Sequence, residues 1–265
     1  MNAQTIISSP QNSQIQLVRK LLSQSKARQR EQAFVAEGVR LIQDGLRSGF
    51  PVRTMFKKEN ASPLAEEFAA GIAHDHPISV VQDKLFEELS DTENPQGLLA
   101  VFEMRELPLP KELTFLVVLD QIRDPGNMGT ILRSAEAAGA EAVLLPSGNT
   151  DPFSPKVVRA GMGAHFRLPI LSLPWDGIAA LSTGLPVYHA DMDGKQSCWQ
   201  ADFLSPLVLL IGGEAQGISP EGQKLATTSV HIPMKGQTES LNAAISASVL
   251  MFEVMRQRTH NTNSN

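Results

Sequence analysis

The sequence predicts an α/β protein of two domains joined by a stiff connector. Short apolar runs alternate with segments of helical periodicity along the chain, a pattern typical of sheets covered by helices. The 265 residues suit two domains of roughly 100–200 residues each. Pro108 and Pro110 stand at alternate positions, which disfavours a helix or a central strand there. We therefore predict domains at 1–105 and 114–265, with a linker at 106–113.

The composition excludes several classes of protein. Apolar residues make up 42% and charged residues 19%, which rules out a largely disordered chain. The longest aliphatic run, Leu207–Ile211, is far shorter than the ~20 residues of a membrane span, and the first residues lack a secretion-signal pattern. Cys198 is the only cysteine, which excludes an intramolecular disulfide and a multi-cysteine zinc site. We expect a cytoplasmic protein without membrane contact or a metal.

The first domain reads as a small alternating α/β unit. Ile15, Val18, Leu21 and Leu22 follow helical spacing, as do the later sets Val39, Ile42, Leu46 and Leu85, Phe86, Leu89. Short apolar runs at 52–56, 78–81 and 98–102 predict strands.

Basic residues are concentrated near the start of the chain. Residues 1–60 carry ten Lys and Arg against four Asp and Glu, although the whole chain has a net charge of -5. Five of them lie close together, namely Arg19, Lys20, Lys26, Arg28 and Arg30. They are either a solvated helix face or a surface that contacts a polyanion, because phosphate binding depends on local charge.

The second domain has the pattern of a parallel sheet covered on both faces. Continuous apolar runs at 115–119, 142–145 and 207–211 predict strands, and shorter strands are predicted at 186–190 and 230–232. Helices are predicted at 126–139, from about 220, and at 241–258. Ligands bind such sheets at the carboxyl ends of the strands. The loops that follow the strands are therefore the candidate site.

The first of these loops, 120–133, opens a helix. Gly126 and Gly129 permit close backbone approach, and Asn127 is a candidate N-cap. Arg133 lies six residues after Asn127, almost two helical turns on, where capping does not explain an arginine. A surface salt bridge is the alternative interpretation.

Two further loops carry unusual chemistry. Three glycines surround Glu214 directly after the strand at 207–211, which suits either a backbone-lined ligand site or a tight turn with a capping glutamate. In the loop 232–242, Ser240 is a candidate N-cap of the last helix, whereas Asn242 is a poor helix former that capping by Ser240 leaves unexplained.

Other chemistries find little support. No phosphate-binding loop is present, and Phe166 replaces the third glycine of a dinucleotide fingerprint that begins at Gly161. His74 and His76 suit a solvated loop. His189, Asp191 and Asp193 lie beside a common Asp-Gly turn pair.

The three loops, in this order and each after a strand, resemble the SpoU branch of the SPOUT RNA methyltransferases, which transfer a methyl group from S-adenosylmethionine to a ribose 2′-hydroxyl. The motifs are Asn-x-Gly-x-x-x-Arg at 127–133, Gly-Gly-Glu-x-x-Gly at 212–217, and Ile-Pro-Met followed by Ser-Leu-Asn at 232–242. The resemblance covers about residues 115–258. It implies a deep trefoil knot in the second domain and a homodimer whose interface builds the active site.

The resemblance also implies roles for individual residues. The catalytic set is Asn127, Arg133, Glu214, Ser240 and Asn242, and the cofactor-binding set is Gly212, Gly213, Gly217, Ile232, Met234 and Leu241. Residues 12–104, including Phe34–Leu46 and Asn94–Gly97, resemble the family's substrate-binding domain of the ribosomal-protein L30e type. That assigns RNA binding to the five clustered basic residues.

The expected substrate is ribosomal RNA of the 23S type, and not DNA. A transfer-RNA 2′-O-methyltransferase and a non-catalytic RNA-binding assembly factor of the same fold are the alternatives. The sequence leaves open which nucleotide is modified, whether the substrate is naked RNA or a precursor particle, and whether Arg133 is a base or an electrostatic stabiliser.

Overall fold

The chain forms two compact units in the computed structural model, which describes residues 6–90, 92, 94–213, 217–237 and 240–262. Unit 1 comprises residues 1–105 together with 153–166, and unit 2 comprises 106–152 together with 167–265. The return of residues 153–166 to unit 1 has no signal in the local sequence pattern. Among the described residues, no helix combines the length and the apolar character that crossing a membrane requires.

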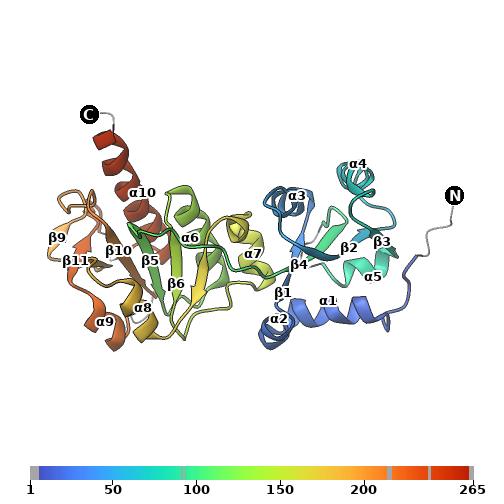
Figure 1. Cartoon of the computed structure of the whole chain (residues 1–265), viewed down its shortest axis with the longest axis horizontal. Helices are drawn as coiled ribbons and strands as arrows, with labels where there is room; N and C mark the ends of the chain where they lie inside the picture. Colours follow the sequence, from blue (N-terminus) through green and yellow to red (C-terminus); the bar gives the residue numbers. More distant parts are fainter. Residues whose placement is uncertain (1–5, 91, 93, 214–216, 238–239, 263–265) are drawn as a thin grey trace. The chain divides into compact units, whose positions relative to one another are not determined.

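Unit 1 is built on a four-stranded mixed sheet with the strand order β1-β4-β2-β3 (Figure 1). β4 pairs antiparallel with both β1 and β2, whereas β2 and β3 are parallel. The strands are β1 (Ala33–Glu37), β2 (Val52–Lys58), β3 (Ile78–Val81) and β4 (Leu98–Glu103). The helices are α1 (Ser13–Ser23), α2 (Ser25–Glu31), α3 (Val39–Arg47), α4 (Pro63–Ile72), α5 (Asp83–Glu87) and α7 (Pro155–Gly161), followed by a 3₁₀ turn, η1 (Ala164–Phe166).

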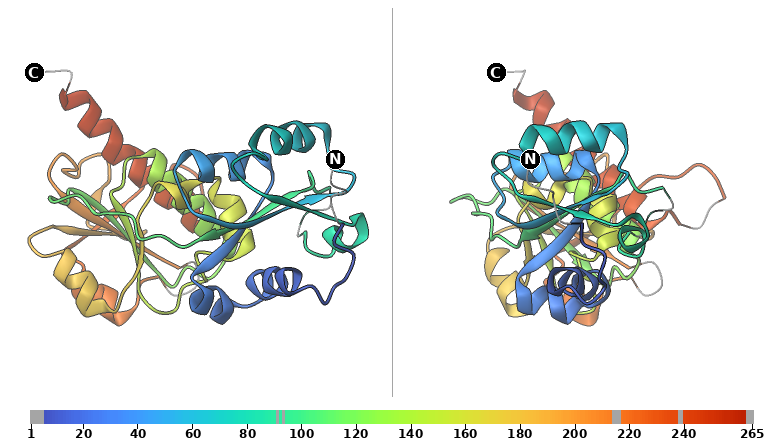
Figure 2. Two further views of the ribbon diagram at one scale, coloured as in Figure 1. Left: turned by 45° about the vertical axis from the view of Figure 1, so that its right-hand side comes forward. Right: turned by 90° about the vertical axis from the view of Figure 1, so that its right-hand side faces the viewer.

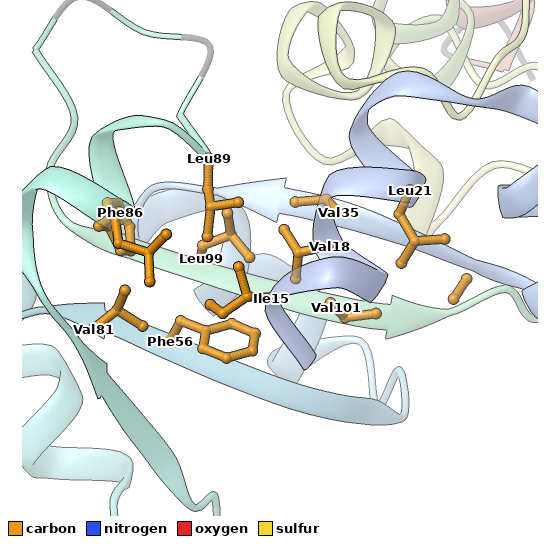
Figure 3. Close-up of a cluster of buried hydrophobic side chains, with 12 residues drawn as sticks. Ile15, Val18, Leu21, Val35, Phe56, Val81, Phe86, Leu89, Leu99 and Val101 are labelled. Atoms are coloured by element: carbon orange, nitrogen blue, oxygen red, sulfur yellow. The ribbon is translucent and has the colours of Figure 1, made fainter. Parts of the chain in front are cut away.

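The core of unit 1 forms where α1 packs on the sheet. Ile15, Val18 and Leu21 recur every three residues, so they share one helix face, and all three are fully buried. Figure 3 shows them against side chains of the strands, among them Phe56 and Val101. The helix predicted from this spacing is therefore confirmed.

An aromatic cluster explains why residues 153–166 join unit 1. Phe166 lies with its ring centroid 5.0 Å from that of Phe102 and 5.8 Å from that of Phe34. Gly45 on α3 leaves room for these rings, since a Cβ atom there would lie 2.5 Å from Phe102 and 2.8 Å from Phe166. A larger residue at position 45 would therefore disrupt this packing.

Unit 2 contains a seven-stranded sheet with the order β7-β6-β5-β10-β8-β11-β9, in which all pairs are parallel. The strands are β5 (Phe115–Asp120), β6 (Ala142–Leu145), β7 (Ile170–Ser172), β8 (Val187–Ala190), β9 (Gln196–Ser197), β10 (Leu207–Gly212) and β11 (Thr228–His231). The helices are α6 (Pro125–Ala137), α8 (Trp175–Leu181), α9 (Pro220–Leu225) and α10 (Ala243–Thr262). The predicted parallel sheet is confirmed.

Helices cover both faces of this sheet. α6 and α10 lie on one face and α8 and α9 on the other (Figures 1 and 2). Leu116 and Val118 of β5 pack with Ile178 of α8, while the alternate residues Val117 and Leu119 are also fully buried. The parallel arrangement brings the carboxyl ends of β5, β10, β8 and β11 to one edge. The trefoil knot implied by the resemblance stays a prediction.

Candidate functional site

A large cavity opens at the carboxyl ends of β10, β8 and β11. Its volume is about 900 Å³, within the range of small-molecule sites in proteins. The six residues predicted to bind a cofactor, Gly212, Gly213, Gly217, Ile232, Met234 and Leu241, all line it. The segments that follow β8, β10 and β11, which are separate in the sequence, thus meet at one place, as expected at the carboxyl ends of parallel strands.

Glycine backbone forms one wall of the cavity. Gly213 and Gly217 exchange two backbone hydrogen bonds of 3.1 and 3.0 Å, which close the turn that follows β10. A Cβ atom on Gly212 would lie 2.4 Å from the carbonyl carbon of Gly217, and one on Gly213 would lie 2.3 Å from the carbonyl oxygen of Gln121. Both positions therefore require glycine. Glu214, predicted to be catalytic, lies outside the described residues.

Two asparagines join the helices beside the cavity. Asn242 Nδ2 donates to Asn127 Oδ1 at 3.1 Å, although the residues are 115 positions apart. Asn242 Oδ1 also accepts from the backbone N–H groups of Ala244 and Ile245, at 2.9 and 3.3 Å. Asn242 is thus the N-cap of α10, and the suggestion that Ser240 caps this helix is wrong. Ser240 instead lines the cavity.

The start of α6 also differs from the prediction. Asp124 is its N-cap and accepts from the N–H of Asn127 at 2.8 Å, with Pro125 in the first turn. Asn127 is therefore not the cap. Because Asp124 caps the start of α6, the Asn127 side chain does not serve as the cap, and its Oδ1 accepts the hydrogen bond from Asn242.

Arg133 projects from the second turn after Asn127 and is exposed. α6 packs along α10, where Ser134 and Ser248 lie with their hydroxyl oxygens 2.8 Å apart. Within the described part of the chain, no hydrogen bond or ion pair engages the Arg133 guanidinium. The surface salt bridge considered from the sequence is therefore not present among these residues.

The basic cluster of unit 1 divides into two groups. Arg28 is only 4% exposed, and its guanidinium donates to the carbonyl oxygens of Leu21 and Leu22 at the end of α1. Its assignment to RNA binding is therefore wrong, since burial keeps it from a phosphate. Lys20, Lys26 and Arg30 are exposed.

The remaining member, Arg19, pairs with Glu88, and Arg30 pairs with Glu31 at 3.0 Å. Exposed ion pairs of this kind contribute only about 0–1 kcal/mol, so a phosphate can replace the glutamate.

His189 and Asp191, which the sequence interpretation set aside, also line the cavity. So do Met192 and Gln223, which the motifs did not indicate. His189 Nδ1 lies 3.1 Å from the carbonyl oxygen of Thr228, and its Nε2 lies 3.3 Å from Asp191 Oδ2. The position of His189 and Asp191 at the end of β8 could have indicated this placement. No group of three or more potential metal ligands occurs within the described ranges.

Cys198 does not have the properties of a nucleophile. It is fully buried, and burial raises the pKa of its thiol to about 11, so the thiolate is scarcely populated at neutral pH. Chemistry through a cysteine adduct is therefore disfavoured.

Comparison with known proteins places both parts of the chain. A family model described as the SpoU rRNA Methylase family matches residues 114–252, and one described as the MRM3-like substrate binding domain matches residues 12–100. The 23S rRNA (uridine(2479)-2′-O)-methyltransferase of Streptomyces viridochromogenes is 34% identical, over 93% of this chain and 91% of that protein. The 23S rRNA (guanosine(2553)-2′-O)-methyltransferase RlmP of Bacillus subtilis is 29% identical, over 89% and 93%.

Solved structures agree with this placement. The AdoMet-bound rRNA methyltransferase from Sinorhizobium meliloti has a TM-score of 0.82 and 33% identity, covering 96% of this chain and 98% of that one. The SpoU methyltransferase AviRb from Streptomyces viridochromogenes, in complex with AdoMet, has a TM-score of 0.81 and 31% identity, covering 94% and 100%.

Proposed function

The chain belongs to the SpoU rRNA methylase family, and from this premise we infer that it transfers a methyl group from S-adenosylmethionine to a ribose 2′-hydroxyl in ribosomal RNA. The observation that carries the inference is the cavity at the strand ends, which lies against the Asn127–Asn242 pair. We propose RNA of the 23S type as the substrate, since the two relatives named above act on 23S rRNA.

The cavity suits S-adenosylmethionine on its own chemistry. The glycine backbone at Gly212, Gly213 and Gly217 lets a flat ligand approach this wall of the cavity closely, because no side chain stands in the way. Aliphatic side chains such as Ile211, Ile232 and Leu241 provide apolar contact for a flat base. When bound, S-adenosylmethionine supplies an electrophilic methyl group, and the protein must align a ribose oxygen with it.

The polar residues beside the cavity perform that alignment. Asn127 and Asn242, held by their mutual hydrogen bond, orient the ribose. Guanidinium groups keep their proton in proteins, so Arg133 does not act as the base. It binds the adjacent phosphate and stabilises the alkoxide that develops on the ribose. Ser240, free of the capping role, contacts the RNA phosphate.

The first test is the reaction itself. We expect one 2′-O-methyl site in ribosomal RNA to be present in cells that carry the gene and absent from cells that lack it. Mapping 2′-O-methylation in total RNA measures this directly. A lost site in transfer RNA would instead support the alternative substrate, and cofactor binding without any lost site would support a non-catalytic assembly factor.

We propose that Lys20, Lys26 and Arg30 contact RNA. Their combined replacement by glutamine is expected to weaken RNA binding and to make the dependence of log K on log salt shallower by about 2, since each lost phosphate contact removes about 0.7–0.9. The matched control replaces two exposed lysines of unit 2, Lys111 and Lys224, by glutamine. An unchanged salt slope in the triple variant would remove this surface from RNA binding.

We also propose that the protein is a homodimer. α10 exposes two large apolar side chains at a spacing of seven residues, Ile245 (53%) and Phe252 (41%). Such a stripe on a helix suits burial against a second copy of the same helix face. Phe252→Glu is expected to convert dimers into monomers in sedimentation at micromolar concentration, whereas Leu64→Glu, at an exposed leucine of unit 1, is expected to leave the dimer intact. A monomeric wild-type protein would contradict the proposal.

A cytoplasmic location is part of the same proposal. It is supported by the single buried cysteine, Cys198, which suits a reducing compartment. Cell fractionation with an antibody to the chain tests it.

A further inference from the structure

Asp120 is a buried carboxylate that the proposed reaction does not use. It ends β5, whose five preceding residues are all apolar, and it has no exposed surface. Its Oδ1 atom has no hydrogen-bond partner in the described structure. Since an apolar residue would avoid the cost of burying a charge, the carboxylate calls for a specific reason.

The contact that Asp120 does make is to the far end of the turn after β10. Its Oδ2 accepts the backbone N–H of Ser219 at 2.6 Å. A charge-assisted hydrogen bond of this length in a buried site is strong. Gly222 leaves space for the carboxylate, because a Cβ atom there would lie 2.8 Å from Oδ2.

The near end of the turn is held by the same strand. Gly212 lies beside Asp120 in the parallel ladder of β10 and β5. The next residue, Gly213, packs on the carbonyl oxygen of Gln121 so closely that a Cβ atom would be excluded. Gln121 itself has a left-handed backbone, with φ 62°, which turns the chain toward α6.

Asp120, the last residue of β5, and Gln121, the residue that follows it, therefore hold both ends of the segment that lines the cavity. Six residues after Gln121 the same chain reaches Asn127, which contacts Asn242. We propose that Asp120 is a positioning residue, which fixes the cofactor-binding turn relative to the residues that orient the ribose. This inference rests on the proposed function of the cavity.

The test compares carboxylates at the two ends of β5. Asp120→Ala is expected to raise the Kd for S-adenosylhomocysteine at least tenfold and to raise the KM for S-adenosylmethionine by more than it lowers kcat. Asp120→Asn keeps an acceptor for the Ser219 N–H, so its Kd is expected to stay within about threefold of the wild type. Calorimetry and steady-state kinetics on the full chain measure these values.

Glu141 provides the matched control. Its carboxylate also accepts backbone N–H groups, those of Thr114 and Phe115, but at the opposite end of β5. Glu141→Ala is expected to lower the melting temperature without changing the Kd. An equal rise of Kd in both alanine variants would reduce Asp120 to a general structural role and overturn the proposal, as would an unchanged Kd in Asp120→Ala.

A second variant covers the case in which Asp120→Ala does not fold. Gly222→Ala keeps the Asp120 carboxylate but displaces it, because the added Cβ atom would lie 2.8 Å from Oδ2. This variant is expected to raise the Kd for S-adenosylhomocysteine by several fold. An unchanged Kd in this variant would count against the proposal. If the wild-type protein fails to bind S-adenosylhomocysteine, it is the function of the cavity that fails, which separates the two results.

Discussion

Replacing Arg133 by lysine is expected to lower kcat by about 100-fold, with the Kd for S-adenosylhomocysteine unchanged within about twofold. Lysine keeps the charge but loses the planar fork that binds a phosphate and a developing oxyanion together. Loss of one such oxyanion contact typically costs 10²–10³ in kcat. Cofactor affinity is spared because Arg133 does not line the cavity.

The measurement is methyl transfer from labelled cofactor to ribosomal RNA, with binding followed separately by calorimetry. Arg256→Lys is the control, since Arg256 is an exposed arginine of α10 that pairs with Glu253 at 2.7 Å. It is expected to keep near-normal turnover. Near-normal kcat in Arg133→Lys would show that the site does not need the guanidinium and would remove Arg133 from its assigned role.

The sequence predicts the central strands well because burial leaves a direct mark on them. The predicted strand at 142–145 coincides with β6, and those at 115–119 and 207–211 each lack only the last residue. Strands buried on both faces are continuous apolar runs, so their limits are visible without an alignment. The strand-end rule then brings the three motif-bearing loops together.

The sequence does not predict helices and strands that lack an apolar run or stripe. α2 is rich in polar and charged residues and has no apolar stripe, and β9 is two residues long. The start of α4 is marked in the sequence, because Ser62 before Pro63 is a typical helix start, and the Ser62 hydroxyl accepts the N–H of Ala65 at 3.3 Å.

Long-range contacts limit how much of the site can be predicted from the sequence. The observed N-caps are Asp124 for α6 and Asn242 for α10, whereas Asn127 and Ser240 were the candidates. Asp and Asn are both preferred N-cap residues, so these two caps could have been predicted from the local sequence. Two other hydrogen bonds could not have been predicted, because each joins segments about a hundred residues apart. They link Asn127 with Asn242 and Asp120 with Ser219. The same holds for the aromatic packing that brings residues 153–166 into unit 1.

Gly212→Val is expected to abolish cofactor binding. The Cβ atom alone would lie 2.4–2.6 Å from three backbone atoms of Gly217 and Ile218, so the turn must open before any larger group is accommodated. That opening breaks the paired hydrogen bonds between Gly213 and Gly217 and moves the wall that faces the cavity. We expect the Kd for S-adenosylhomocysteine to rise more than 100-fold in calorimetry.

Gly236→Val separates steric block from a general effect of adding a branched side chain to a loop. Gly236 lies in the loop after β11, and a Cβ atom there meets nothing within 4 Å. Its variant is expected to bind with near-normal Kd. Both variants are expected to unfold cooperatively, because Gly212 is the half-buried last residue of β10 and the five residues before it form the fully buried part of the strand. Tight binding by a folded Gly212→Val protein would mean that the cofactor lies elsewhere, since the valine displaces the wall of the cavity that Gly212 and Gly217 form.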